Sequence, residues 1–167
     1  MSNRYFIAPI MLTLALLAGC GIYTFSGSTL PSYMKTVDVP LFANQTLEPG
    51  LAESITEAVG RQVLSNNALD KVNSSGDATI TGAVRGYTNQ EYQYDIEGER
   101  DVNVTQYMVR LVVYVEFIDN HKNEALYKGT VEGQGIYDFG TEQEEDGRQR
   151  AIEEVVRLIF EKSVQSW

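Results

Sequence analysis

The stretch 102-VNVTQYMVRLVVYVEF-117 carries the strongest β-strand pattern in this chain. Successive side chains of a strand point to opposite faces, and this stretch is rich in the β-branched and aromatic residues that favour strands. One face holds Tyr107, Val109, Leu111, Val113, Val115 and Phe117. The other face holds Met108, Arg110, Val112, Tyr114 and Glu116. We therefore predict a long strand that buries one wholly apolar face of a sheet.

Three further strands are predicted around this one. Lys35–Phe42 alternates apolar and polar residues, although its proline lacks an N–H and indicates a strand end or an edge position. Ala78–Thr88 alternates in the same way, and Ala125–Gln134 is a last strand weakened by two glycines. The polar connection 118–124 has the character of a hairpin turn. The segment 70–77 is predicted as a loop, with or without a short strand before it.

Two amphipathic helices are also predicted. The first spans 49–65, since Pro49 suits a first helical turn and apolar residues follow at helical spacing. The second spans 142–164 and begins at a predicted capping box, with Thr141 at the cap and Glu144 three residues later. The first apolar stripe is Leu51, Ile55, Ala58, Val59 and Val63, and the second is Ala151, Ile152, Val155, Val156, Ile159, Phe160 and Val164.

The predicted elements follow the order strand-helix-strand-strand-strand-helix. A sheet with one apolar face can bury the apolar stripes of two helices packed against that face. We therefore predict an α+β fold, a two-layer sandwich with a mixed four-stranded sheet and two helices packed on one face. Residues 35–167 form a single domain in this prediction, which is long enough for a substantial core.

The N-terminal residues have the pattern of a secretory signal peptide. Arg4 precedes an apolar stretch at 5–17, which is shorter than the roughly 20 residues that a membrane-spanning helix needs. Residues 17–20, Leu-Ala-Gly-Cys, then match the lipobox of bacterial lipoprotein precursors at every position. This match predicts signal cleavage between Gly19 and Cys20 and a fatty-acylated Cys20. The alternative is a signal peptide followed by an ordinary free cysteine.

The chain therefore divides into a signal peptide at 1–19, a lipidated cysteine with its tether at 20–34, and the domain. The residue after the cysteine is Gly21, whereas an aspartate there retains lipoproteins in the inner membrane of many Gram-negative bacteria. We expect a protein anchored by its lipid to the periplasmic face of the outer membrane.

The charge balance narrows the possible partners. The chain has 23 acidic and 13 basic side chains and a net charge of −10. Such a surface argues against nucleic acid, which requires a basic footprint, and against broad attraction to an anionic bilayer. Contact with an anionic lipid phosphate would depend on a few locally placed cations. The cations of the strand region are Arg85, Arg100, Arg110, Lys122 and Lys128.

No pattern in the sequence predicts catalysis, a metal site or a cofactor. Acids at the start of the second helix are favoured by the helix dipole and by solvation. His121 lies two residues from Asp119 in a predicted turn, without a nucleophile in a suitable motif. The glycines of 133-GQGIYDFG-140 lack the spacing of a phosphate-binding loop. The acids at the start of the second predicted helix are Glu142, Glu144, Glu145 and Asp146. We therefore expect a non-enzymatic protein without a cofactor.

Tyrosines flank the connection between the second and third strands. Large amphipathic rings on an extended hairpin are favoured where protein partners bind. The alternative is ordinary cross-strand pairing of aromatic side chains, and the sequence leaves both open. The candidate partner contacts are Tyr87, Tyr92, Tyr94 and Tyr107.

Taken in order, several stretches resemble the LptE family of lipoproteins. They are 20-CGIYTFSGSTLP-31, 35-KTVDVPLFANQT-46, 48-EPGLAESITEAV-59, 106-QYMVRLVVYVEF-117 and 153-EEVVRLIFEKSV-164. The resemblance spans the chain from the lipobox to the second helix. It implies the same strand-helix-three-strand-helix sandwich that the periodicity predicts.

The resemblance also implies a function in lipopolysaccharide assembly at the outer membrane. The domain would sit as a plug and folding partner inside an LptD-like β-barrel and would contact lipopolysaccharide, without catalysis. Basic residues near the strand ends would make the lipopolysaccharide contacts, and the candidates are Arg85, Arg100, Lys122 and Lys128. Two alternatives are a structural lipoprotein of another envelope secretion or assembly machine, and a lipid-anchored periplasmic hydrolase.

Overall fold

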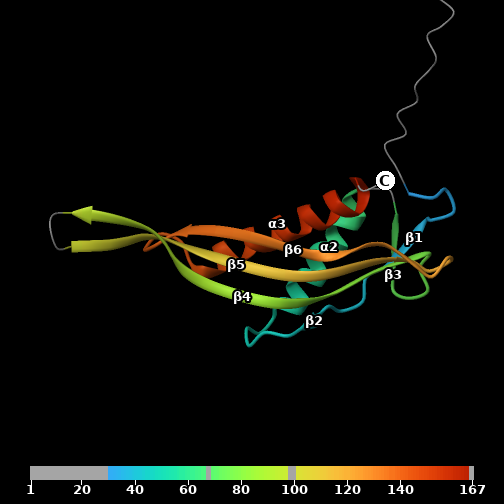
Figure 1. The fold of residues 1–167 in the computed structure, drawn as a ribbon, viewed down its shortest axis with the longest axis horizontal. Coiled ribbons are helices and arrows are strands. Elements are labelled where there is room, and N and C mark those ends of the chain that lie inside the picture. Colours follow the sequence, from blue (N-terminus) through green and yellow to red (C-terminus); the bar gives the residue numbers. More distant parts are fainter. Residues whose placement is uncertain (1–29, 67–68, 98–100, 166–167) are drawn as a thin grey trace, which may run out of the picture.

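The computed structural model describes residues 30–66, 69–97 and 101–165, and for residues 66, 94–97, 101–103, 164 and 165 it describes the backbone alone. Three long antiparallel strands form the body of the sheet (Figure 1). They are β4 (Ala78–Glu97), β5 (Asp101–Asp119) and β6 (Glu124–Asp138). The predicted strand at 102–117 is confirmed as the centre of this meander, because β5 pairs with β4 on one side and with β6 on the other.

Short parallel strands complete the sheet at its other edge. β1 (Thr36–Asp38) lies between β3 (Asp70–Val72) and β4, and β2 (Ala43–Asn44) pairs with β4 farther along. The described residues thus form a mixed sheet of six strands instead of the predicted four. The continuous strand predicted at 35–42 is wrong, since Pro40 has no N–H for the ladder and β1 ends at Asp38.

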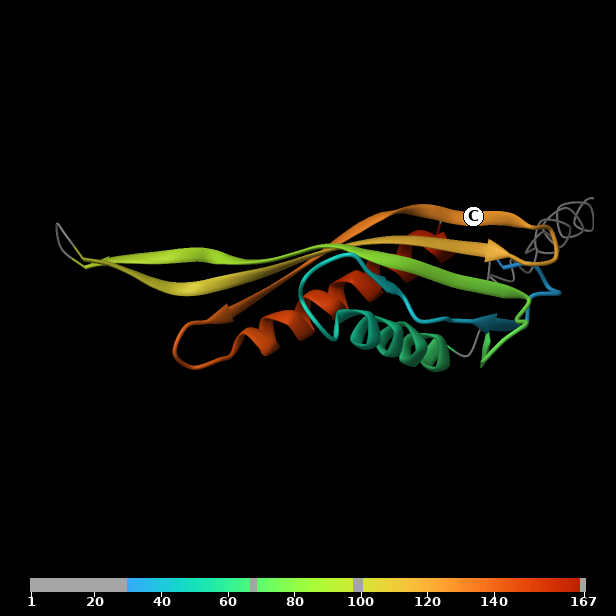
Figure 2. The same cartoon turned by 90° about the horizontal axis from the view of Figure 1, so that it is seen from below.

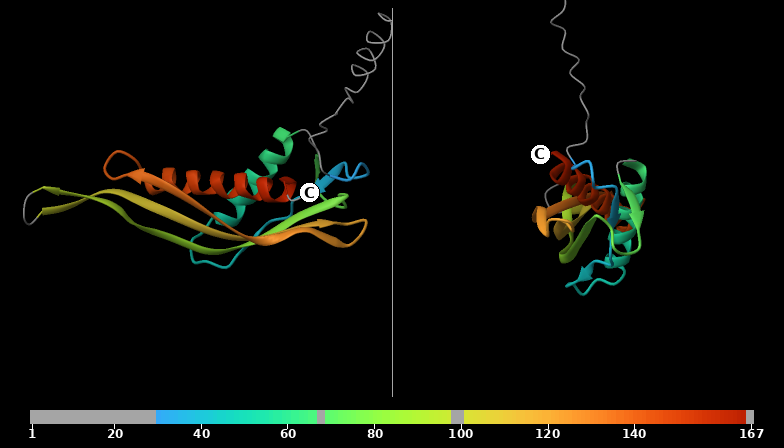
Figure 3. Two further views of the ribbon diagram at one scale, coloured as in Figure 1. Left: turned by 45° about the horizontal axis from the view of Figure 1, so that its top comes forward. Right: turned by 90° about the vertical axis from the view of Figure 1, so that its right-hand side faces the viewer.

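Two helices pack on one face of the sheet, as predicted (Figures 2 and 3). α2 (Leu51–Asn66) and α3 (Glu144–Gln165) agree with the predicted ranges to within two residues. The predicted capping box at Thr141 and Glu144 is wrong by two positions. The carboxylate of Asp146 instead accepts the backbone N–H of Gln143 at 2.8 Å. The helix therefore starts later, after a turn that passes through the left-handed Gly140 (φ 86°).

The core lies between the helices and the face of the sheet that the alternation predicts. Along β5, Val109, Leu111, Val113, Val115 and Phe117 are all buried. Both helical stripes pack against them, and Leu51, Ile55, Val155 and Ile159 are fully buried. The opposite face of the sheet, which we call the outer face, carries no helix among the described residues. The β5 residues on it are Met108, Arg110, Val112, Tyr114 and Glu116.

Glycines bring α3 directly onto β6. A Cβ atom on Gly135 would collide with the carbonyl oxygen of Gly147, and one on Gly133 would collide with the carbonyl oxygen of Ala151. Backbone atoms on both sides cannot move aside without shifting the helix. Gly133 and Gly135 are therefore needed for the close approach of helix and sheet, whereas a Cβ atom on Gly129 would meet the hydroxyl of Tyr127 instead of the helix.

The β4–β5 hairpin extends well beyond the rest of the sheet. β6 ends at Asp138, opposite Gln106 of β5, so residues 93–97 and 101–105 continue as a ribbon of two strands. We call this ribbon the arm, and Figures 1 and 2 show it projecting past the helices. A register irregularity around Tyr92 marks its base. β1 and the β5–β6 turn lie at the opposite end of the molecule.

Candidate functional site

The predicted site residues fall partly outside the described structure. Gly19, Cys20 and Arg100 lie outside the described residues, and Tyr94 is described by its backbone alone. The remaining candidates are Arg85, Lys122 and Lys128 among the cations, and Tyr87, Tyr92 and Tyr107 among the tyrosines. In the structure, Arg85 and Lys128 lie together on the outer face, Lys122 lies at the β5–β6 turn, and the tyrosines lie towards the arm.

Arg85 and Lys128 come together on the outer face around one tyrosine. The guanidinium carbon of Arg85 lies 4.0 Å from the ring centroid of Tyr114, and the Lys128 ammonium lies 5.9 Å from the same centroid. Arg85 is exposed at a register irregularity of β4, and it forms no ion pair with any described residue. Tyr114 thus gathers two cations from strands on either side of β5.

Lys128 is partly neutralised by a neighbouring carboxylate. Its ammonium group lies 2.7 Å from Glu116, which also accepts the hydroxyl of Tyr114 at 2.5 Å. These hydrogen bonds lower the pKa of Glu116, and the same pairing raises the pKa of Lys128. Arg110 on the same face pairs with Glu132 at 3.3 Å. Arg85 is therefore the cation of this face whose charge is least compensated.

Lys122 belongs to a different cluster at the opposite end from the arm. It lies in the β5–β6 turn, 5.8 Å from the ring centroid of Tyr33. His121 in the same turn packs edge-on against Tyr33 and places its Nε2 atom 2.7 Å from Asp77. Asp119, for which the sequence predicts no catalytic role, binds the backbone of this turn and the hydroxyl of Tyr33.

The tyrosines do not form one continuous surface. Tyr87 is half-buried and donates its hydroxyl to Glu144 of α3 at 2.6 Å, and burial together with this bond raises its pKa. Tyr92 at the base of the arm is 49 % exposed. Tyr107 stacks on Tyr137 of β6 with ring centroids 5.7 Å apart. Packing thus accounts for Tyr87, while Tyr92 and Tyr107 keep accessible surface.

The rings of Tyr137 and Phe139 both lie beside Tyr107, and no pattern in the sequence predicts this cluster of three rings. The ring of Phe139 lies 5.6 Å from that of Tyr107 and is 64 % exposed. Tyr107, Tyr137 and Phe139 border a depression of about 350 Å³, which we call the aromatic hollow. The hollow is lined by Tyr107, Tyr137, Phe139, Gly140, Glu142, Gln143 and Glu144. β6 runs to Asp138 instead of the predicted 134, which is why these rings were missed.

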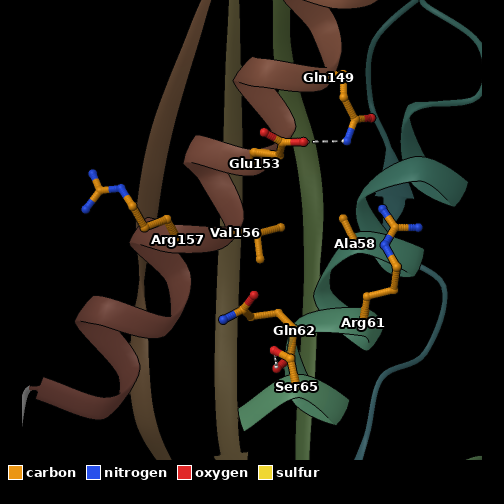
Figure 4. A pocket seen from close by; sticks show the side chains of 8 residues that line it. All are labelled: Ala58, Arg61, Gln62, Ser65, Gln149, Glu153, Val156 and Arg157. Carbon is orange, nitrogen blue, oxygen red and sulfur yellow. Dashed lines mark hydrogen bonds between the residues drawn. The ribbon is translucent and has the colours of Figure 1, made fainter.

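A second depression, of about 410 Å³, lies between α2 and α3 (Figure 4). Ala58 and Val156 are its apolar residues, and Gln149 bonds to Glu153 across one turn of α3 at 2.9 Å. The two arginines that border it are paired within their own helices, Arg61 with Glu57 and Arg157 with Glu154 and Glu161. Both cations of this groove are therefore compensated, and Glu153, which accepts only the amide of Gln149 within the described residues, is its carboxylate.

The described residues contain no group of three or more His, Cys, Asp and Glu side chains arranged to hold a metal ion. Within the same ranges, none of the helices combines the length and the apolar character that crossing a membrane requires. The described residues present three distinct surfaces: the outer face with Arg85 and Lys128 around Tyr114, the aromatic hollow, and the groove between α2 and α3.

Comparison with known families identifies the chain. The family model LptE, described as lipopolysaccharide-assembly, matches residues 34–163. The chain belongs to the LptE family. The match covers all the described strands and nearly all of both helices, so the resemblance inferred from the sequence is confirmed. A comparison with curated protein sequences gives no match.

Solved structures support the fold of this LptE-family protein at low sequence identity. The hypothetical protein CT253 of Chlamydia trachomatis aligns with a TM-score of 0.54 and 11 % identity, covering 77 % of this chain and 97 % of that one. Uncharacterized lipoprotein B of Nitrosomonas europaea gives 0.53 and 15 %, with coverages of 82 % and 85 %. The PelC dodecamer of Paraburkholderia phytofirmans gives 0.51 and 13 %, with coverages of 82 % and 92 %. At such identities the likeness is one of fold.

Proposed function

We propose that this protein is a non-enzymatic outer-membrane lipoprotein that acts in lipopolysaccharide assembly as the plug and folding partner of an LptD-like β-barrel. The observation that carries the proposal is the LptE family match over residues 34–163. The fold is consistent with a plug, since the helices, sheet and arm form an elongated body with several distinct surfaces (Figure 3). The polar groups of these surfaces are suited to binding and show no catalytic arrangement among the described residues.

The lipid anchor is part of the proposal. Cys20 would carry the fatty-acyl chains after cleavage behind Gly19, and two or more chains on one residue bind a membrane stably. The described chain begins at Leu30, ten residues later. Because an extended chain spans at most about 3.6 Å per residue, this end of the domain would stay within about 36 Å of the anchored sulfur.

Membrane fractionation tests the anchor directly. We expect wild-type protein in the outer-membrane fraction and a Cys20→Ser variant, which loses both the acylation site and the lipobox cleavage signal, outside that fraction. Gly21→Asp is the matched variant, which keeps the lipid and should shift the protein to the inner-membrane fraction. A Cys20→Ser protein that still floats with outer membranes would contradict the anchor.

Lipopolysaccharide contact is assigned to the candidate cations, with Arg85 and Lys128 at its centre. A phosphate group suits a guanidinium that has no carboxylate partner, and Tyr114 holds Arg85 and Lys128 near each other. Arg100 and Lys122 remain candidates at other positions. We expect Arg85→Ala with Lys128→Ala to weaken binding to purified lipopolysaccharide several-fold, whereas Arg61→Ala on α2 should not. Equal binding by both variants would remove this assignment.

Co-purification tests the plug function. The acylated protein, extracted in a mild detergent from its native membrane, should retain a large β-barrel protein of the LptD type. Depletion should leave that barrel misassembled and lower the lipopolysaccharide at the cell surface. A correctly assembled barrel and normal lipopolysaccharide export in depleted cells would end the proposal.

The alternative is a structural lipoprotein of another envelope machine. The likeness in fold to PelC, which was crystallised as a dodecamer, makes the oligomeric state a discriminating measurement. A stable ring of identical copies, without a barrel protein, would favour the alternative. A complex of one copy with one barrel would favour the plug.

A further inference from the structure

We propose that the aromatic hollow binds a lysine or arginine side chain presented by a protein partner, with apolar residues beside it. In the setting of the proposed function, on which the identity of the partner rests, the basic residue belongs to the barrel protein. The hollow is separate from the cationic outer face, because its rings project from the helix side of the sheet.

The hollow lies where the arm leaves the sheet. Tyr107 comes from β5, and Tyr137 and Phe139 come from the end of β6 and the residue that follows it. The turn that leads into α3 closes the other side, beneath the base of the arm (Figure 2). A partner that contacts the arm would therefore meet the hollow as well.

The rings of the hollow are held in place, although Phe139 is largely exposed and Tyr107 is partly so. The backbone N–H of Phe139 donates to the carbonyl of Thr105 at 2.9 Å, so this residue continues the β-ladder instead of lying in a free loop. The hydroxyl of Tyr137 accepts the side-chain amide of Asn89 at 2.8 Å. The ring of Phe139 is 64 % exposed and adjoins that of Tyr107, so the two rings form one apolar surface of the kind that partners cover.

The charge around the hollow favours a cation. Glu142 and Glu144 both line it, and Asp138 lies beside them at the end of β6. Glu142 is already paired with Arg150. Glu144 accepts only the hydroxyl of Tyr87 and forms no ion pair within the described residues. A cation over the ring faces would gain both the attraction of the π-systems and that of this carboxylate.

The lining of the hollow also argues against two other ligands, a phosphate group and a metal ion. A phosphate group would face Glu142 and Glu144, so the hollow is unsuited to the anionic ligand proposed for the outer face. A hard metal ion requires several converging oxygen ligands, whereas this lining offers two carboxylates, one of which is already paired with Arg150. A basic side chain suits both the charge and the rings of the hollow. Its charged head would meet Glu144, and its aliphatic stem would pack on Phe139 and Tyr107.

A peptide titration tests the chemistry without requiring the barrel. The acylated full-length mature chain, labelled with ¹⁵N in non-ionic detergent micelles, is titrated with the capped peptide Gly-Leu-Arg-Leu-Gly. We expect the amide resonances of Phe139, Gly140 and Gln143 to shift progressively. A matched peptide with citrulline in place of arginine should bind roughly three- to tenfold more weakly, because it keeps the shape and loses the charge.

Two variants test which side chains of the hollow contribute to binding of the arginine peptide. Glu144→Gln keeps an acceptor for Tyr87 and removes the charge, and Phe139→Ala removes the exposed ring. Each should weaken arginine-peptide binding roughly three- to tenfold. Glu153→Gln, which removes one carboxylate from the α2–α3 groove, is the control and should change binding less than twofold. Equal affinity of the arginine and citrulline peptides, or shifts confined to the outer face, would overturn the proposal.

The barrel complex supplies an independent readout. A photo-crosslinking amino acid at position 139 should capture a barrel peptide that contains lysine or arginine. If the barrel co-purifies normally and the crosslink at 139 is absent, the hollow proposal fails and the plug function stands. If no barrel co-purifies, the proposed function fails, and the peptide titration alone decides the hollow. Concentration-dependent dimers that Phe139→Ala abolishes would show that a second copy occupies the hollow, which also overturns the proposal.

Discussion

The hydroxyl of Tyr33 donates a hydrogen bond to the carboxylate of Asp119, a side chain that is 0 % exposed at the end of β5. The same carboxylate accepts the backbone N–H groups of His121 and Lys122 at 2.9 and 3.2 Å. One buried acid thus connects the segment that enters the domain to the turn between its two last strands. The bonds lower the pKa of Asp119, so the carboxylate is held ionised.

Replacement of Tyr33 by phenylalanine should weaken this connection. The variant leaves Asp119 with its two backbone donors and without the hydroxyl, and a buried acceptor that loses a partner destabilises the fold. We expect the midpoint of thermal unfolding to fall by several degrees, as followed by circular dichroism. Tyr92→Phe is the control, since its ring is half exposed at the base of the arm, and its midpoint should stay unchanged. Equal midpoints for all three proteins would show that the bond contributes nothing.

The Glu142–Arg150 pair should make stability depend on acid pH. Arg150 and the backbone N–H of Asp138 lower the pKa of Glu142 from 4.5 to about 2 in the folded protein. A group whose pKa is lower in the folded state than in the unfolded state stabilises the fold above the unfolded value. That contribution is lost as the pH falls from about 4.5 towards 2.

The variant Glu142→Gln isolates this effect. Its unfolding midpoint in urea should lie below that of the wild type by a constant amount between pH 6 and 8 (roughly neutral, where the carboxylate is ionised in both states). The difference should shrink steadily as the pH is lowered through the acid range. A difference that is unchanged or larger at acid pH would contradict the pairing.

The close contact between β6 and α3 predicts a severe effect at one glycine. A methyl group at position 135 would meet the backbone oxygen of Gly147, which cannot move without displacing α3. We expect Gly135→Ala to destabilise the protein by about 3 kcal/mol or more, or to prevent soluble expression. Gly86→Ala, where the nearest atoms lie at 3.4 Å, should cost less than about 1 kcal/mol. Chemical denaturation of both variants measures the contrast.

The two faces of β5 predict opposite outcomes at adjacent positions. Leu111 is fully buried against the helices, so Leu111→Ala should cost about 2–5 kcal/mol through lost burial and a new cavity. Val112 is its neighbour on the outer face and is only half-buried. Val112→Ala should cost less than about 1 kcal/mol. Similar losses at both positions would mean that the outer face is covered as fully as the core.

The core of the fold follows directly from periodicity, and the short strands do not. The alternation of β5 and the helical stripes at Leu51–Val63 and Ala151–Val164 identify the buried faces, because burial itself imposes those periods. β2 has two residues and β3 has three, too few for any period. They exist through pairing with strands distant in sequence, which local patterns do not encode.

The candidate surfaces were predicted only in part, for a related reason. β4 was predicted to end at Thr88, but it continues to Glu97, because residues 88–93 are all exposed and have no apolar alternation to extend the pattern. Phe139 was overlooked since it follows the last predicted strand, and its meeting with Tyr107 depends on the register of β6. Arg85 and Lys128 were named from their charge, whereas the ring of Tyr114 that gathers them appears only in the assembled sheet.

β4 and β5 continue without interruption from the sheet into the arm. This continuity limits how the length of the arm can change. Because side chains alternate with a period of two, inserting one residue in each strand would turn every later side chain to the opposite side. Inserting two would preserve the pattern and carry the tip outward by about 7 Å. Natural variation in hairpin length among proteins of this architecture is therefore expected to proceed in steps of two residues in each strand.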